Sequence, residues 1–89
     1  MGLRDAPELL FKADLAIAIT RAIERRKLSQ SRAAAIVQID QPKVSALMSG
    51  DTRGFSVDRL LKILTLLGHD IDIHVNAAKG AKGRVRVAA

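Results

Sequence analysis

The apolar residues in the first third of the chain recur at the spacing of one helix face. Leu15, Ile19 and Ile23 lie four positions apart, with charged residues among the positions between them. This pattern predicts an amphipathic helix over residues 7–26. A proline suits the first turn of such a helix, and a basic run suits its negative C-terminal end. Both ends of the segment therefore agree with the helix that the spacing predicts.

Two shorter helices are predicted in the middle of the chain, each after a residue that suits a helix N-cap. Ser29 precedes residues 30–37, in which three consecutive alanines favour helix and allow close approach of a neighbouring helix. Asp40 precedes residues 41–48, where a proline in the first turn loses no hydrogen bond. Gly50 can end this helix in a left-handed conformation. The pattern indicates two short helices joined by a tight turn.

The next part of the chain has a wide apolar helix stripe, followed by strict alternation of polar and apolar residues. Ser56 suits the N-cap of a fourth helix, whose apolar stripe runs over residues 57–67. Residues 70–75 read Asp-Ile-Asp-Ile-His-Val, which is the pattern of a strand with one buried face. We therefore expect a short C-terminal strand after the helices.

A lone strand with one apolar face needs a cover and a neighbour. We expect this one to pair across a two-fold axis, or to pack beside the fourth helix of a second copy. The expected homodimer interface comprises Ile71, Ile73 and Val75. The basic tail, residues 76–89, either returns as a weak strand near residues 84–87 or forms a disordered arm.

Composition narrows the class of partner. The chain has 89 residues, enough for one small domain, and a formal net charge of +6. This charge favours nucleic acid or an acidic membrane surface. Two phenylalanines and no tryptophan or tyrosine disfavour recognition by base stacking, so duplex DNA is favoured over single-stranded RNA. The absence of cysteine excludes disulfides and thiolate metal sites.

Other function classes find little support. The N-terminus lacks a signal-peptide pattern and no apolar run approaches the ~18 residues of a membrane helix, so we expect a cytoplasmic protein without a membrane partner. His69 and His74 have aspartates between them but no third convergent ligand. We expect no metal, no cofactor and no enzymatic activity, because no nucleophile and base combination is evident.

The middle of the chain contains a recognisable motif, which consists of Leu28-Ser29-Gln30, Ala33-Ala34, Ile39, Gln41-Pro42, Val44-Ser45, Leu47 and Gly50. This motif closely resembles the Cro/C1-type, or xenobiotic-response-element (XRE) type, helix-turn-helix family. The later segment, residues 55–73, resembles the subgroup of antitoxins encoded beside RelE-like toxins. Gln38 departs from the family pattern, which often has glycine between the two helices, where positive φ is needed.

The resemblance implies an all-α, lambda-repressor-like helix-turn-helix bundle of four to five helices with a short C-terminal β-strand or hairpin. The DNA-binding domain would span residues 7–75, between a polar leader over residues 1–6 and the basic tail over residues 76–89. It also implies a repressor that binds a palindromic operator in double-stranded DNA. The finer expectation is an autorepressing antitoxin with a RelE-like toxin as a further partner. The alternative is a protein-interaction module that uses the same helical fold without binding DNA.

The chemistry of the side chains suggests which residues contact DNA. Glutamine pairs with two atoms of adenine in the major groove, and Gln41 stands at the start of the second short helix. The expected base contacts are Gln41, Pro42, Ser45 and Ala46. The expected phosphate contacts are Gln30, Arg32, Lys43, Arg53 and Ser56, which lie at helix starts or carry positive charge.

Overall fold

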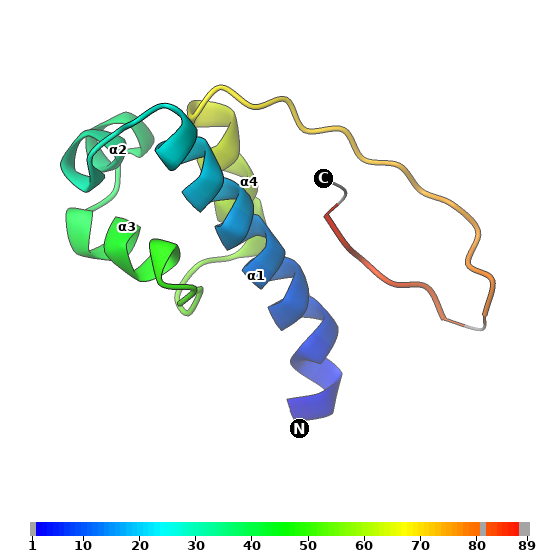
Figure 1. Ribbon diagram of the computed structural model, residues 1–89. Coiled ribbons are helices and arrows are strands. Elements are labelled where there is room, and N and C mark those ends of the chain that lie inside the picture. Colours follow the sequence, from blue (N-terminus) through cyan, green and yellow to red (C-terminus); the bar gives the residue numbers. More distant parts are fainter. Residues whose placement is uncertain (1, 81, 88–89) are drawn as a thin grey trace.

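The computed structural model describes residues 2–80 and 82–87. Over these residues the chain forms four helices: α1 (Gly2–Arg25), α2 (Gln30–Val37), α3 (Gln41–Met48) and α4 (Val57–Leu66). Figure 1 shows α1 as a long rod that packs along α4, with α2 and α3 to one side. The all-α helix-turn-helix bundle is confirmed, with four helices in the described part of the chain.

The first helix is longer than the sequence pattern predicts. It begins at Gly2 and continues without a break to Arg25, so it includes residues that we expected to form a polar leader. The predicted core face is correct, because Leu15, Ile19 and Ile23 are each at most 2% exposed. The N-terminal part of α1 extends past the other helices in Figure 1.

The core lies between all four helices, and it sets the position of α3. Its largest fully buried side chains are Ile19, Leu47, Leu60, Leu67 and Val44. Two of these five belong to α3, so one face of this short helix is fixed against the core. The other face of α3 remains on the surface.

The turn between α2 and α3 depends on one residue in a left-handed conformation. Gln38 has φ 61° and ψ 43°, and its backbone N–H donates to the carbonyl oxygen of Ala34. This confirms the expectation that a non-glycine residue occupies a position with positive φ. Ile39 follows, is half-buried and packs against the core, where it fills the space between the two helices. Lys27 adopts a second positive φ, 55°, which the sequence did not suggest.

The predicted C-terminal strand is wrong. Residues 70–75 are extended but form no strand, and no backbone hydrogen bond among the described residues involves positions 70–87. The physical reason is that alternation specifies an apolar face but supplies no neighbouring backbone to pair with. The predicted return strand is absent too, although Figure 1 shows the tail turning back toward the bundle. Near its end Val87 packs against the edge of the core.

Candidate nucleic-acid interface

The expected base contacts lie on the outer face of α3. With 3.6 residues per turn, Gln41, Pro42, Ser45 and Ala46 fall on the side of the helix opposite Val44 and Leu47. The burial agrees with this geometry. Val44 and Leu47 are 2% and 1% exposed, whereas Gln41 and Pro42 are exposed and the other two are half-buried. The structure therefore brings these four predicted residues together on one surface.

The N-terminus of α3 is open to solvent. Asp40 occupies the N-cap position, as predicted, but its side chain makes no capping hydrogen bond. Its backbone carbonyl oxygen accepts from the N–H groups of Lys43 and Val44 at 3.0 and 3.2 Å. Lys43 is exposed on the flank of the same turn. No described side chain of the protein covers the tip of α3 at Gln41.

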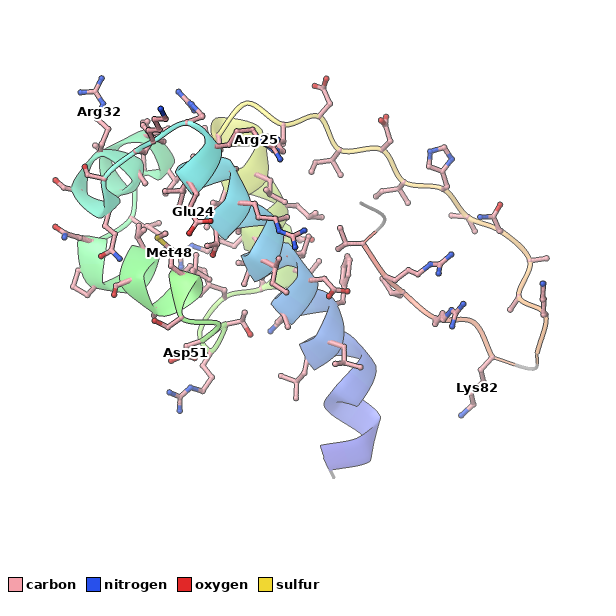
Figure 2. All side chains as sticks on the ribbon, viewed as in Figure 1. Glu24, Arg25, Arg32, Met48, Asp51 and Lys82 are labelled. Atoms are coloured by element: carbon pink, nitrogen blue, oxygen red, sulfur yellow. The ribbon has the colours of Figure 1, made fainter. Side chains whose placement is uncertain are left out.

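The start of α2 presents a second set of predicted contacts. The Ser29 hydroxyl oxygen accepts from the N–H of Arg32 at 3.0 Å, which confirms Ser29 as the N-cap. Gln30, the first residue of the helix, is half-buried, and Arg32 is exposed. Figure 2 shows the Arg32 side chain extending away from the bundle at the end where α2 lies. Both residues are free to meet a phosphate, but their predicted role is not tested by the structure.

Arg53 is held by a neighbouring carboxylate in the loop after α3. Its Nε and Nη2 atoms donate to Oδ1 and Oδ2 of Asp51, each at 2.9 Å. The hydrogen bonds from the Arg53 side chain and backbone lower the pKa of Asp51 from 3.8 to about 2. The same hydrogen bond and ion pair raise the pKa of Arg53. Asp51 therefore balances the positive charge that we expected Arg53 to offer to DNA, a pairing that the sequence analysis missed.

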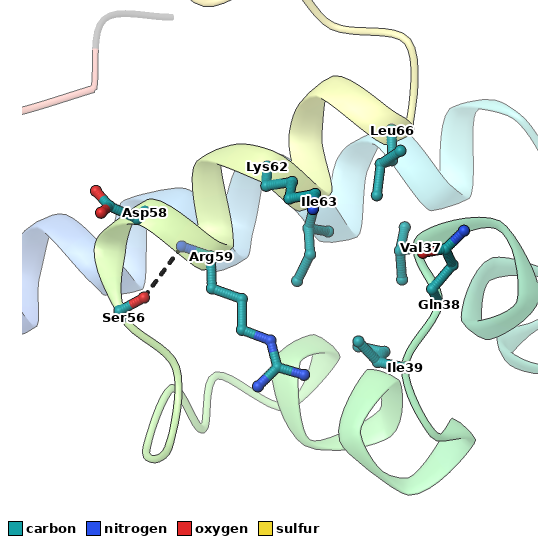
Figure 3. A pocket seen from close by; sticks show the side chains of 9 residues that line it. All are labelled: Val37, Gln38, Ile39, Ser56, Asp58, Arg59, Lys62, Ile63 and Leu66. Atoms are coloured by element: carbon teal, nitrogen blue, oxygen red, sulfur yellow. Dashed lines mark hydrogen bonds between the residues drawn. The ribbon is translucent and has the colours of Figure 1, made fainter.

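Ser56 serves first as a helix cap. Its hydroxyl oxygen accepts from the N–H of Arg59 at 3.1 Å, and Figure 3 marks this hydrogen bond. Because the oxygen accepts, the hydroxyl hydrogen is still available to donate to a phosphate. The sequence pattern did not indicate a role for Arg59. The guanidinium carbon of Arg59 lies 5.2 Å from the centroid of the Phe55 ring. That distance is within the range of a cation–π contact.

Beside Arg59 a groove opens between α4 and the turn joining α2 to α3. Its volume is about 400 Å³, and Figure 3 shows the nine side chains that line it. We call it the α4 groove. Ile39, Ile63 and Leu66 supply apolar surface, and Arg59 and Lys62 supply positive charge.

The described residues contain no group of three side chains suited to hold a metal ion. His74 is exposed, whereas His69 is half-buried and its Nδ1 atom is buried without a hydrogen-bond partner. Among the helices of residues 2–80 and 82–87, none combines the length and apolarity needed to span a bilayer.

The three residues predicted to form a dimer interface differ in exposure. Ile71, Ile73 and Val75 are 36%, 77% and 90% exposed. Their role between two copies is not tested by a single chain, so it stays a prediction.

Comparison with known proteins agrees with this geometry. A family model described as "Helix-turn-helix domain" matches residues 1–76. A search of curated proteins finds no match. A solved structure described as "Putative XRE Family Transcriptional Regulator" is 40% identical, with a TM-score of 0.82 over 96% of this chain and 96% of that chain. The chain belongs to the XRE-type helix-turn-helix family.

Proposed function

We propose that the protein is a non-enzymatic transcriptional repressor that recognises a specific sequence in double-stranded DNA. The observation that carries this proposal is the exposed N-terminus of α3, where Gln41 and Pro42 face solvent while Val44 and Leu47 fix the helix to the core. A helix held in this way can enter the major groove with its first turn leading. Gln41 is then placed to pair with N6 and N7 of an adenine.

The charge of the molecule supports binding to the DNA backbone. The net charge of +6 attracts the phosphates, and the starts of α2 and α3 direct backbone N–H groups outward. We assign phosphate contacts to Gln30, Arg32, Lys43, Arg53 and Ser56. Base contacts give sequence preference, whereas these contacts fix the position of the protein on the duplex.

We further propose that the protein acts as a homodimer on a palindromic operator. Two copies would place their α3 helices in successive major grooves, about 34 Å apart. The exposure of Ile71, Ile73 and Val75 supports this arrangement. Burying these apolar side chains against a second copy would remove them from water and so favour the dimer.

The finer assignment, an autorepressing antitoxin, rests on the resemblance of residues 55–73 to that subgroup. A RelE-like protein encoded beside this gene would support it. Mixing the two purified proteins tests the assignment directly, because an antitoxin must form a complex with its toxin and suppress the toxin's activity.

The DNA-binding proposal is tested by selecting duplexes from a random library and measuring affinity for the selected site and for random DNA. Gln41→Ala should lose about 5- to 150-fold on the selected site and little on random DNA, because a base contact is worth ~1–3 kcal/mol. Lys43→Ala should weaken both DNAs alike. Arg25→Ala, an exposed cation on α1, is the charge control.

Equal losses on both DNAs for Gln41→Ala would remove its role in sequence recognition. Failure of the native protein to enrich any duplex would favour the alternative, a protein-interaction module on the same fold.

A further inference from the structure

We propose that residues 70–75 of one protomer, here called the C-terminal arm, dock into the α4 groove of a second copy. This inference rests on the proposed function, of which the homodimer is a part. It identifies which surface of the second copy the arm covers.

The α4 groove has an apolar floor and a positively charged rim. Ile63 is buried at its base, and Leu66, at one end of the groove, is 38% exposed. Arg59 and Lys62 are exposed and stand one turn apart on the same face of α4. Asp58 also lines the groove, but Figure 3 shows its carboxylate pointing away from the side where Arg59 extends. An occupant with apolar and acidic side chains suits this surface.

The C-terminal arm has that combination of side chains. Ile71 and Ile73 alternate with Asp70 and Asp72, so the two types project on opposite sides of the extended chain. Within residues 2–80 and 82–87, the arm's backbone makes no hydrogen bond to the rest of the chain. Its isoleucine at position 73 is 77% exposed.

The spacings of the charges also match. Two residues apart on an extended chain, Asp70 and Asp72 are separated by about 7 Å. Three residues apart on a helix, Arg59 and Lys62 have Cβ atoms about 5–6 Å apart. Long cationic side chains bridge the small difference, so each aspartate can meet one cation while the isoleucines contact the accessible apolar surface of Ile39 and Leu66.

The arm does not reach the groove of its own chain. Three residues separate Leu66 from Asp70, and Figure 1 shows the chain leaving the end of α4 on the side away from α2 and α3. A second copy offers the same groove and the same arm. Reciprocal docking of two arms closes a two-fold dimer without leaving either groove open.

Engineered cysteines test which surfaces meet, because the chain has no native cysteine. We mix Leu66→Cys protein with Ile73→Cys protein under mild oxidation, without DNA. The inference expects a disulfide between the two different variants, since docking brings these positions together. Disulfides between two Ile73→Cys chains without the mixed product would show arms pairing with each other and would overturn it. An intrachain disulfide in the Leu66→Cys/Ile73→Cys double variant at high dilution would also overturn it.

A charge exchange tests the ion pairs by sedimentation. With Ile73 beside Leu66, Asp72 lies next to Lys62, so Lys62→Asp and Asp72→Arg should each weaken the dimer by about tenfold or more, and the double variant should return to within about threefold of the native protein. Arg25→Asp should leave the dimer unchanged, and circular dichroism melts confirm that each variant folds. Absence of rescue, or a native protein that is monomeric at micromolar concentration, would overturn the inference. Neither result affects the Gln41 experiment, so the proposal of DNA recognition and the proposal of arm docking can fail separately.

Discussion

Gln38 holds a backbone conformation that costs most residues energy. Its φ of 61° lies in the left-handed region, where a side chain costs about 1–2 kcal/mol and glycine costs little. Gln38→Gly removes this strain but adds entropy to the unfolded chain, at about 0.5–1 kcal/mol. We expect a net gain of about 0.5–1 kcal/mol in the free energy of unfolding, and a rise in Tm of about 2–8 °C.

Thermal melts of matched variants check this expectation. Lys27→Gly should change Tm in the same direction, because Lys27 has φ 55°. Gln38→Val should lower Tm, since a β-branched residue is strained most in this region. A lower Tm for Gln38→Gly would mean that contacts of the glutamine side chain outweigh the backbone strain.

The pair formed by Asp51 and Arg53 bears on the phosphate contact that we propose for Arg53. Asp51 is ionised at neutral pH because its pKa is about 2, so the charge of Arg53 is already balanced. Asp51→Asn should raise affinity for selected and random DNA alike by several fold. It should also make the slope of log affinity against log salt more negative by up to about 1 per protomer. Asp51→Asn/Arg53→Gln should lose this gain, and a gain that persists would assign it to another cause.

The same pair has a defined pH window. A carboxyl whose pKa is lowered on folding stabilises the folded state above its ordinary pKa, here 3.8, and loses that effect as pH falls toward about 2. The difference in unfolding free energy between the native protein and Asp51→Asn should be constant above about pH 4 and shrink below it. Urea titrations over this range measure the difference, and a change centred near pH 6 would exclude Asp51 as its source.

At the scale of the helices, two serine caps fix where α2 and α4 begin. The hydroxyl oxygens of Ser29 and Ser56 accept from backbone N–H groups at 3.0 and 3.1 Å. Replacing either with alanine should lower the free energy of unfolding by about 1 kcal/mol. Ser31→Ala is the control, since this exposed serine lies inside α2 and alanine favours helix there. Chemical denaturation that finds Ser29→Ala no more costly than Ser31→Ala would reject the capping account.

These caps also explain which helices the sequence could predict. Both ends of α2 and α3 were predicted at the observed residues, because cap residues and apolar spacing agreed there. The start of α1 was missed, since no cap residue signals a beginning at Gly2 and Pro7 favours a later one. The positive φ at Gln38 was predicted, but the one at Lys27 has no local signal.

The candidate site was predictable only where helix spacing decides it. The outer face of α3 follows from the period of 3.6 residues, so the exposure of Gln41 and Pro42 was predicted correctly. The contact between Arg59 and Phe55 and the bidentate pair at Asp51 depend on how a loop folds back. Alternation along a sequence does not contain that information.

On the scale of the whole molecule, the C-terminal arm has no neighbouring backbone to pair with in a single chain. Its alternation was recognised in the sequence, but the strand predicted from it does not form, because a strand requires a second backbone. The apolar face of the arm is therefore exposed in one protomer and would be covered only in an assembly. The proposed arrangement of two copies would therefore have consequences for the spacing of their DNA site.

The two-fold dimer that we propose would fix the separation of its two α3 helices, and so the spacing of operator half-sites. Inserting about 5 base pairs between the halves of a selected site turns one half to the opposite face of the duplex. Affinity should then fall by about 100-fold or more, toward that of a single half-site, because the second contact is lost. Asp72→Arg, in which the proposed dimer is weakened, should bind the native and lengthened sites with similar affinity. Gel shifts at protein concentrations where sedimentation shows a dimer make the comparison. Equal binding of the native protein to both sites would mean that its two recognition helices are not held at a fixed distance.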